Sequence, residues 1–289
     1  MDEQAVLKRL ADRVPMAGDD AAVVDGLVVT TDMLHQSTDF PQGTTRYTAG
    51  WRAVGASLSD VAAMGAEAVA TVAVYGAPEF EWDQIELFVS GAMDVSTSAG
   101  GAYVGGDLDQ HEEFTVATTA IGRTDQPVYR RGASSGEVVC VTGTLGRTAA
   151  ALAHFQAGNG QRGNELFQFT PRVSAGKLLA GRASAMIDSS DGLARSLHQL
   201  ASASECGFAL DTPLPIDSAV DAVAADETDR REMGMHFGED FELVCTVPRG
   251  AVADLQDDLD VSLTPIGEVT ESGVTLDGKS VPDRGYSHG

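Results

Sequence analysis

Aspartates beside glycine, or at the predicted ends of strands and helices, are the residues of this chain best suited to chemistry. They occur in six places: Gly18-Asp19-Asp20, Thr30-Thr31-Asp32, Ser59-Asp60, Gly105-Gly106-Asp107, Asp188-Ser189-Ser190-Asp191-Gly192 and Gly238-Glu239-Asp240. Carboxylates are the oxygen ligands that Mg²⁺ prefers, usually one or two of them together with substrate phosphates. Converging carboxylates repel one another unless cations lie between them. If the six sites meet in space, they suit phosphoryl transfer, in which catalysis is mostly positioning and charge neutralisation.

The competing interpretation is that these aspartates only solvate or cap the elements that carry them. Asp257-Asp258 is such a case, because it has no glycine neighbour and falls on a predicted surface helix. Asp60 also fits it: at about 100° per residue, Asp60 falls about 120° away from the apolar face of its predicted helix. Spacing alone therefore leaves the metal site and the solvated surface both open.

The predicted elements place the aspartates at their ends and indicate an α/β (α+β) fold. Asp25-Gly26 between two apolar runs predicts a hairpin of strands 21–24 and 27–31. The further predicted strands are 69–75, 103–105, 114–121, 138–141, 184–187, 241–247 and 263–269, and the helices are 48–64, 82–98, 145–155, one after Pro171, 191–204 and 251–259. We predict a loop over Gly158–Gly163 and a strand-to-helix turn, without the P-loop lysine, over Gly143–Thr148. The polar segment Gly122–Gly136 predicts a boundary between domains 1–126 and 127–289.

The net charge disfavours two kinds of partner, nucleic acids and anionic membranes. The 289 residues carry 43 Asp and Glu against 19 Lys and Arg, a net charge of −24, with only three lysines. A nucleic acid or an anionic membrane surface would be repelled, since no concentrated basic patch offsets the charge. Many acids with few lysines indicate adaptation to high salt, which screens the self-repulsion. We expect no signal peptide, no membrane span, three unpaired cysteines and a cytoplasmic location.

Seven motifs, in order and covering about residues 18–286, resemble the thiamine-monophosphate kinases. They are Asp19-Asp20-Ala21, Thr31-Asp32-Met33-Leu34, Leu58-Ser59-Asp60-Val61-Ala62-Ala63-Met64-Gly65-Ala66, Gly105-Gly106-Asp107, Val141-Thr142-Gly143-Thr144-Leu145-Gly146, Ile187-Asp188-Ser189-Ser190-Asp191-Gly192-Leu193 and Gly238-Glu239-Asp240-Phe241-Glu242-Leu243. The resemblance implies the two-domain aminoimidazole-ribonucleotide-synthetase-like architecture, with an N-terminal ATP- and Mg²⁺-binding domain whose sheet forms the homodimer interface. It also implies direct, in-line transfer of the ATP γ-phosphoryl group to thiamine monophosphate.

The same resemblance assigns roles to individual residues. The implied Mg²⁺ ligands are Asp20, Thr30, Thr31, Asp32, Asp60, Asp107, Asp188 and Asp191. The positions matching ATP contacts are Gly106, Asp107, Arg130 and Ser190, and those matching substrate contacts are Asp39, Asp240 and Tyr286. We take Asp32, Asp188 and Arg130 as the catalytic residues; an arginine clamps phosphate oxygens and stabilises developing charge.

Two departures from the family pattern stand out. Asp39-Phe40 occupies the place of the usual His-Phe pair, and Leu108-Asp109 follows the Gly-Gly-Asp motif in place of Thr-Thr. An aspartate cannot donate a hydrogen bond when ionised, so the substrate contact at Asp39 must differ in kind.

Other functions remain open at this point. One is a different ATP-using enzyme of the same superfamily, such as aminoimidazole ribonucleotide synthetase, selenophosphate synthetase or a hydrogenase-maturation protein. No cysteine precedes Cys140, which disfavours the selenophosphate enzyme, since that would need an N-terminal reactive Cys or selenocysteine. Another is a non-catalytic nucleotide-binding scaffold dimer.

Overall fold

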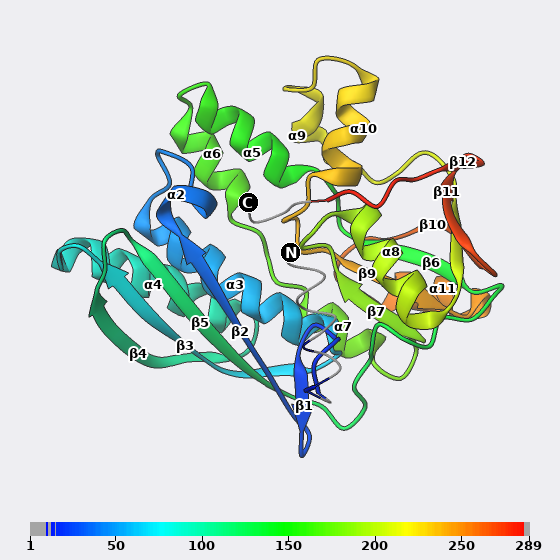
Figure 1. The fold of residues 1–289 in the computed structure, drawn as a ribbon, viewed down its shortest axis with the longest axis horizontal. Helices are drawn as coiled ribbons and strands as arrows, with labels where there is room; N and C mark the ends of the chain where they lie inside the picture. Colours follow the sequence, from blue (N-terminus) through cyan, green and yellow to red (C-terminus); the bar gives the residue numbers. More distant parts are fainter. Residues whose placement is uncertain (1–9, 11–12, 15, 286–289) are drawn as a thin grey trace.

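The computed structural model describes residues 10, 13–14 and 16–285, and it contains two sheets that lie side by side (Figure 1). The N-terminal sheet has the order β1-β2-β5-β3-β4, antiparallel except between β3 and β4. Its strands are β1 (Ala22–Val24), β2 (Leu27–His35), β3 (Glu67–Ala77), β4 (Ala102–Gln110) and β5 (Thr115–Arg123). The predicted hairpin is confirmed, and both turn residues, Asp25 and Gly26, have the positive φ that a tight hairpin turn needs.

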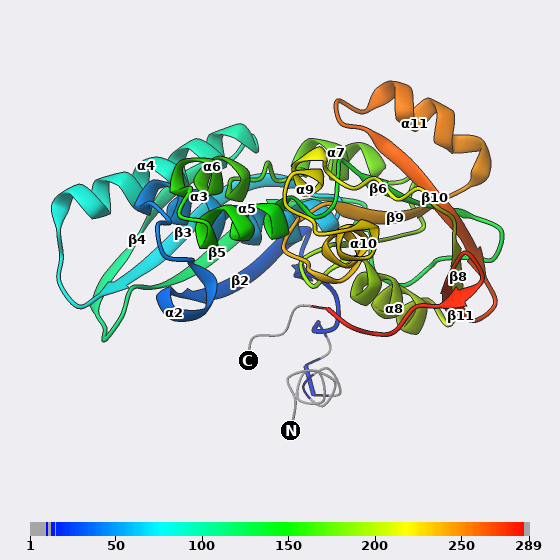
Figure 2. The ribbon, with the colours of Figure 1, turned by 90° about the horizontal axis from the view of Figure 1, so that it is seen from above.

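Within residues 16–285, helices cover one face of this sheet. Figure 2 shows α3 (Arg46–Ala63) and α4 (Trp82–Ser98) on the same side of the strands, with the short α2 (Gln36–Asp39) at the end of β2. Side chains alternate along β2, so that Val28, Thr30 and Leu34 are buried under the helices while Val29 and Met33 are exposed on the other face. We call that second face, with Val29, Met33, Val69, Val72, Val74 and Val104, the outer face.

The C-terminal sheet has seven strands in the order β12-β11-β8-β10-β6-β9-β7. The strands are β6 (Val138–Thr142), β7 (Ala185–Asp188), β8 (Gly207–Leu210), β9 (Leu243–Val247), β10 (Leu263–Thr270), β11 (Gly273–Leu276) and β12 (Lys279–Ser280). The helical elements are α5 (Arg147–Gln156), α6 (Gly160–Phe167), α7 (Val173–Leu179), α8 (Leu193–Ser204), α9 (Ser218–Asp221), α10 (Glu227–His236), η1 (Arg249–Ala251) and α11 (Val252–Asp258). The α/β class is therefore confirmed.

The two halves share their hydrophobic cores. One core joins Leu58 and Val61 of α3 to Cys140 of β6 and Met186 of β7, and another joins Phe88 of α4 to Phe155 and Phe167 of α5 and α6. The predicted boundary after residue 126 falls in the segment between β5 and β6. That segment separates the two sheets, but it does not separate the cores.

The predicted loop at Gly158–Gly163 is wrong. Helix α6 begins at Gly160, because the side chain of Asn159 accepts a hydrogen bond from the Arg162 N–H and caps it. The sequence prediction also missed α10 and the strands β8, β11 and β12. In the part of the chain that the structure describes, no helix is both long and apolar enough to span a bilayer.

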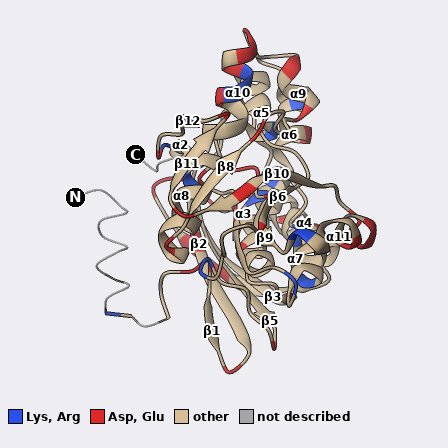
Figure 3. Ribbon diagram, turned by 90° about the vertical axis from the view of Figure 1, so that its right-hand side faces the viewer, with Lys and Arg blue, Asp and Glu red and all other residues tan. Residues whose placement is uncertain are grey.

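Acidic residues are spread over the exposed elements. Figure 3 shows them on α11 and at the tips of α9 and α10, away from the junction of the halves. Asp257 and Asp258, both exposed on α11, belong to this solvated set, as their sequence predicted.

Candidate active site

Three aspartates from distant parts of the sequence meet where the two halves join. Asp20 precedes β1, Asp60 lies in the last turn of α3, and Asp188 ends β7. Each offers a carboxylate oxygen, and these oxygens lie within 4.8 Å of one another. The structure thus brings together three of the predicted metal ligands, which we call the acidic group.

The pKa values in the acidic group reflect burial first and crowded negative charge second. Burial raises the pKa of Asp60 well above its ordinary range, and the carboxylates of Asp32, Asp188 and Asp20 raise it further. Burial, followed by the charge of Asp20, raises the pKa of Asp188 to about 7, against the lowering effect of hydrogen bonds from Ser59 and Ser190. Oxygen donors held this close fit a hard divalent cation, which would favour their ionised forms and offset the repulsion among them.

Arg130 lies beside this group. Its Nη2 donates to Asp20 Oδ1 at 2.8 Å, and its backbone N–H donates to Asp19 Oδ1 at 2.7 Å. The guanidinium is partly exposed, so it retains donors that can face an anion. The neighbouring Arg131 side chain is much more exposed and lies 3.9 Å from Asp19.

The predicted ligands on strand β2 lie on opposite faces of the N-terminal sheet. Thr30 donates to Asp60 Oδ2 at 2.5 Å, and the carboxylate of Asp32 accepts a hydrogen bond from the buried Ser57 of α3. Thr31 is different: its exposed side chain donates to the carbonyl of Thr118, because neighbouring strand residues alternate between faces. The structure therefore places Thr31 on the outer face, away from the acidic group.

The turn after β7 carries two further predicted site residues of the C-terminal half, Ser190 and Asp191. Ser59 of α3 donates to Asp188 Oδ2 at 2.6 Å across the junction, and the Ser190 N–H donates to Asp188 Oδ1 at 3.3 Å. Asp191 is turned toward α8, where Gln199 Nε2 lies 3.5 Å from its carboxylate. Among the residues that the structure describes, Asp32, Asp107 and Asp191 lie outside the acidic group.

Gly106 and Asp107 lie on β4, the edge strand of the N-terminal sheet. Two strands, β5 and β3, separate β4 from β2, which corresponds to roughly 14 Å. A Cβ at position 106 would come within 1.8 Å of the Ala73 carbonyl oxygen, so only glycine fits. Both residues line a cavity of about 410 Å³, together with Tyr75, Phe88 and Tyr103.

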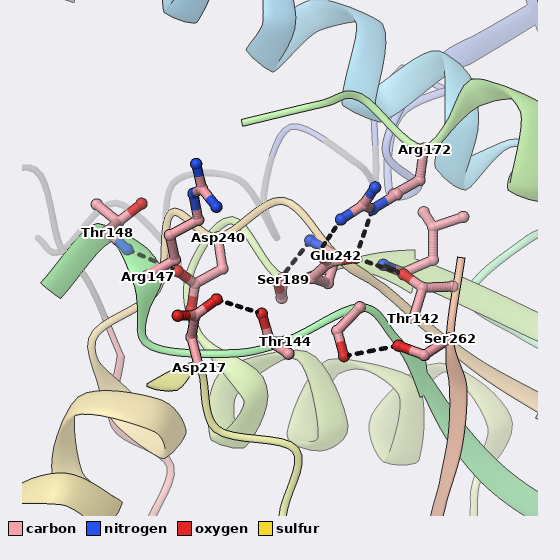
Figure 4. Close-up of polar contacts among 12 residues, drawn as sticks. Thr142, Thr144, Arg147, Thr148, Arg172, Ser189, Asp217, Asp240, Glu242 and Ser262 are labelled. Atoms are coloured by element: carbon pink, nitrogen blue, oxygen red, sulfur yellow. Dashed lines mark hydrogen bonds and ion pairs between the residues drawn. The ribbon is translucent and has the colours of Figure 1, made fainter. Parts of the chain in front are cut away.

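The predicted substrate residues are placed differently from one another. The buried Asp240 accepts hydrogen bonds from the N–H groups of Gly146 (2.5 Å) and Thr148 (2.9 Å), at the start of α5 (Figure 4). Burial raises the pKa of Asp240 to about 7, while these bonds lower it. Asp39 is buried in α2, where its Oδ2 accepts from the His35 N–H and the Thr38 hydroxyl, each at 2.7 Å. Tyr286 lies outside the described residues, so all three substrate contacts stay predictions.

Several polar side chains that support the site were not assigned a role from the sequence. Ser57 and Ser59 are fully buried, and each donates to one of the predicted ligands. Arg172 binds Glu242 through two hydrogen bonds, and Glu242 also accepts from Thr142 (Figure 4). For Ser57 and Ser59, the sequence did hold a signal: each is a small polar residue within a mostly apolar predicted helix. A hydroxyl buried in such a helix must find a hydrogen-bond partner.

Comparison with known proteins assigns the chain to a family. The family model described as AIR synthase related protein, N-terminal domain, matches residues 18–124, and the corresponding C-terminal domain matches residues 134–279. A thiamine-monophosphate kinase from Halobacterium salinarum is 56% identical over 291 residues, which is 100% of both chains. The chain belongs to the thiamine-monophosphate kinase family.

Solved structures agree with this assignment. A thiamine-monophosphate kinase from Stenotrophomonas maltophilia is 31% identical, with a TM-score of 0.82 over 96% of each chain. A structure described as AaThiL complexed with AMPPCP and TMP has a TM-score of 0.89 at 26% identity, and the match covers 99% of this chain and 97% of that one. The recognition of thiamine-monophosphate kinase motifs and of the two-domain architecture is confirmed.

Proposed function

We propose that this protein phosphorylates thiamine monophosphate to thiamine diphosphate with ATP, as a thiamine-phosphate kinase in thiamine diphosphate biosynthesis. The acidic group at the junction of the two halves carries the proposal, since phosphoryl transfer needs a site that binds metal and phosphate together. Full-length identity of 56% to a named thiamine-monophosphate kinase supports the choice of substrate. It also favours this activity over the other ATP-using enzymes of the superfamily.

Asp20, Asp60 and Asp188 would hold Mg²⁺, and Asp32, Asp107, Asp191, Thr30 and Thr31 remain further predicted ligands. When bound, Mg²⁺ neutralises phosphate charge and orients the transferred group. The chain's own contribution is positioning. Ser59 and Ser57 fix the carboxylates of Asp188 and Asp32, and Thr30 fixes that of Asp60. Arg130 is held by Asp20 beside them, where its remaining donors would bind phosphate oxygens as negative charge develops during in-line transfer.

ATP would extend from the acidic group toward β4. The aromatic cavity beside Gly106 and Asp107 has room and stacking surface for an adenine ring, and Ser190 would contact the phosphates. Asp39, Asp240 and Tyr286 stay the predicted contacts to thiamine monophosphate. Asp240 has a further role, because its two bonds to backbone N–H groups order the start of α5.

The outer face supports a homodimer. It exposes six large apolar side chains on one sheet, and Val104 is 63% exposed. Large apolar side chains exposed together on one sheet face favour a protein interface there. A second copy on this face would also cover Thr31 and approach the edge strand that bears Asp107, two of the predicted ligands that lie outside the acidic group of a single chain.

We further propose that the enzyme is cytoplasmic and adapted to high salt. Its net charge of −24 and its three lysines support the second point, because a dense acidic surface keeps a protein soluble when salt screens its charges.

Turnover tests the function directly. Purified protein in high KCl, given ATP, Mg²⁺ and thiamine monophosphate, should form thiamine diphosphate and ADP. Asp32→Asn and Asp188→Asn should abolish this turnover and leave the dimer folded. If thiamine monophosphate is not phosphorylated while ATP is consumed with formylglycinamidine ribonucleotide, the protein is a different enzyme of the superfamily. If the protein binds nucleotide but phosphorylates neither acceptor, the alternative of a non-catalytic nucleotide-binding scaffold dimer would be favoured.

A further inference from the structure

Helix α3 faces both halves of the molecule with different side chains. Ala53, Ser57 and Asp60 lie at spacings of three and four residues, and they face the N-terminal sheet: Ser57 binds Asp32, Asp60 binds Thr30, and the Ala53 carbonyl accepts from Thr118. A second stripe with the same spacing, Arg52, Ala56 and Ser59, faces the C-terminal half. One helix therefore spans the junction on which the acidic group depends.

Arg52 is the charged member of the second stripe, and its side chain is 1% exposed. Its Nη1 donates to the Phe167 carbonyl at 2.9 Å, and its Nη2 donates to Glu239 Oε2 at 3.0 Å and to the Glu239 carbonyl at 3.2 Å. The guanidinium also lies over the Phe167 ring, 3.6 Å from its centroid. A buried cation is costly unless it is paired and hydrogen-bonded, and these partners of Arg52 belong to the C-terminal half.

The segment that Arg52 binds has an unusual backbone. Gly238, Glu239 and Phe241 all have positive φ values, 86°, 57° and 54° respectively. Two of these are not glycine, and a non-glycine residue keeps such a conformation only when its surroundings impose it. Arg52 binds both the carbonyl and the carboxylate of Glu239, so it holds the backbone and the side chain of that residue together.

The same segment fixes the turn that follows Asp188. The Glu239 N–H donates to the Ser190 carbonyl at 2.6 Å, and Ser189 exchanges two hydrogen bonds with Glu242. Figure 4 shows Ser189 beside Glu242, on the opposite side from Arg172. Arg52 is thus linked to the Asp188 turn through residues 239–242, while Ser59 of the same helix binds Asp188 itself.

We propose that Arg52 is a positioning residue for phosphoryl transfer. It holds segment 238–242, and through it the Asp188 turn, at a fixed place relative to Asp60, which lies two turns along the same helix. The acidic group then keeps its geometry because one helix carries one of its aspartates and anchors the segment that supports another. The turnover part of this proposal rests on the proposed kinase activity; the metal-binding part does not.

The test compares Arg52→Met with Arg46→Met. Arg46 is a matched control on the same helix: its guanidinium also lies over a phenylalanine, Phe114, at 3.8 Å, and it donates to Gln36, but both partners belong to the N-terminal half. Mn²⁺ affinity of the nucleotide-free protein is measured by electron paramagnetic resonance, and kcat and KM are measured with thiamine monophosphate. We expect Arg52→Met to weaken Mn²⁺ binding about 10-fold and to lower kcat on the order of 100-fold.

Two further variants separate positioning from folding. Arg52→Lys keeps the charge but not the planar fork, so it should recover part of the lost Mn²⁺ affinity and kcat. Arg52→Met combined with Glu239→Gln removes both charges of the buried pair. This double variant is expected to fold, yet to stay impaired in both Mn²⁺ affinity and kcat. Wild-type Mn²⁺ affinity in the folded single or double variant would overturn the proposal, as would an equal loss in Arg46→Met. If the wild type phosphorylates no thiamine monophosphate, the Mn²⁺ comparison still decides the role of Arg52.

Discussion

The acidic group should make the metal-free protein less stable as the pH rises, and Asp188→Asn should remove part of that effect. The folded protein holds the pKa of Asp188 at about 7, whereas its ordinary value is 3.8. Between these two values the folded state binds a proton that the unfolded state releases. The stability that this proton provides is complete below about pH 4 and is lost as the pH rises through about 7.

The size of the effect follows from the same difference. A change from 3.8 to about 7 corresponds to about 4 kcal/mol of penalty on the ionised carboxylate. Burial causes most of this penalty, and Asp60 shares the part that comes from repulsion, so the figure is an upper limit for Asp188 alone. The asparagine variant keeps the shape and removes the charge. It should match the wild type near pH 4 and be more stable by up to about 4 kcal/mol at pH 8 without metal.

Urea denaturation in EDTA, from pH 4 to pH 8, measures this directly. The quantity to compare is the difference in free energy of unfolding between variant and wild type at each pH. This difference cancels the contribution that the other acidic residues make to both proteins. Asp257→Asn, on the exposed surface of α11, is the control and should change stability by less than about 0.5 kcal/mol. Mg²⁺ should then stabilise the wild type at pH 8 far more than at pH 5, since it binds ionised ligands. A difference that does not vary with pH, or equal Mg²⁺ stabilisation at both pH values, would refute the argument.

Three other predictions concern two supports of the site and the outer face. Ser59→Ala removes the hydroxyl that donates to Asp188, so the Mg²⁺ concentration for half-maximal activity should rise about 10-fold, measured by titration; an unchanged midpoint would exclude that role. Gly238→Ala puts a Cβ 2.6 Å from the Ser190 carbonyl oxygen at a φ of +86°, and denaturant melts should show a loss of about 1–3 kcal/mol. Val104→Asp on the outer face should give monomers in analytical ultracentrifugation, whereas the same change at the exposed Leu178 of α7 should leave the dimer intact.

The fold was predictable from sequence where local signals were strong. The Asp25-Gly26 hairpin was found because its turn chemistry is local, and α4 was found with its observed bounds, 82–98, because proline and glycine flank it. The strands β8 and β11 were missed. They are four-residue strands that pair with each other in parallel, and such pairing depends on contacts distant in sequence. Helix α6 was not predicted because its glycines indicate a loop. The signal for the helix is Asn159, a favourable N-cap residue directly before Gly160.

The candidate site was predictable in its residue types but not in its geometry. Motifs identified Asp20, Asp60 and Asp188, and the structure brings these three together. The motifs could not show that Thr31 faces away from Asp32, although strand alternation could have indicated it. Nor could they show the pairing of Arg52 with Glu239, because residues 187 positions apart meet only once both sheets are assembled.

The shared cores have a consequence for how this protein can evolve. Helices α5 and α6 lie in the part of the sequence matched by the C-terminal family model, yet they pack against Phe88 and Tyr75 of the N-terminal half. A chimera that joins the N-terminal unit of one relative to the C-terminal unit of another would bring together surfaces that were never fitted to each other. Overpacked or empty cores of this kind destabilise a protein by several kcal/mol. We therefore expect substitutions along the shared core of the two units to compensate one another across the chain.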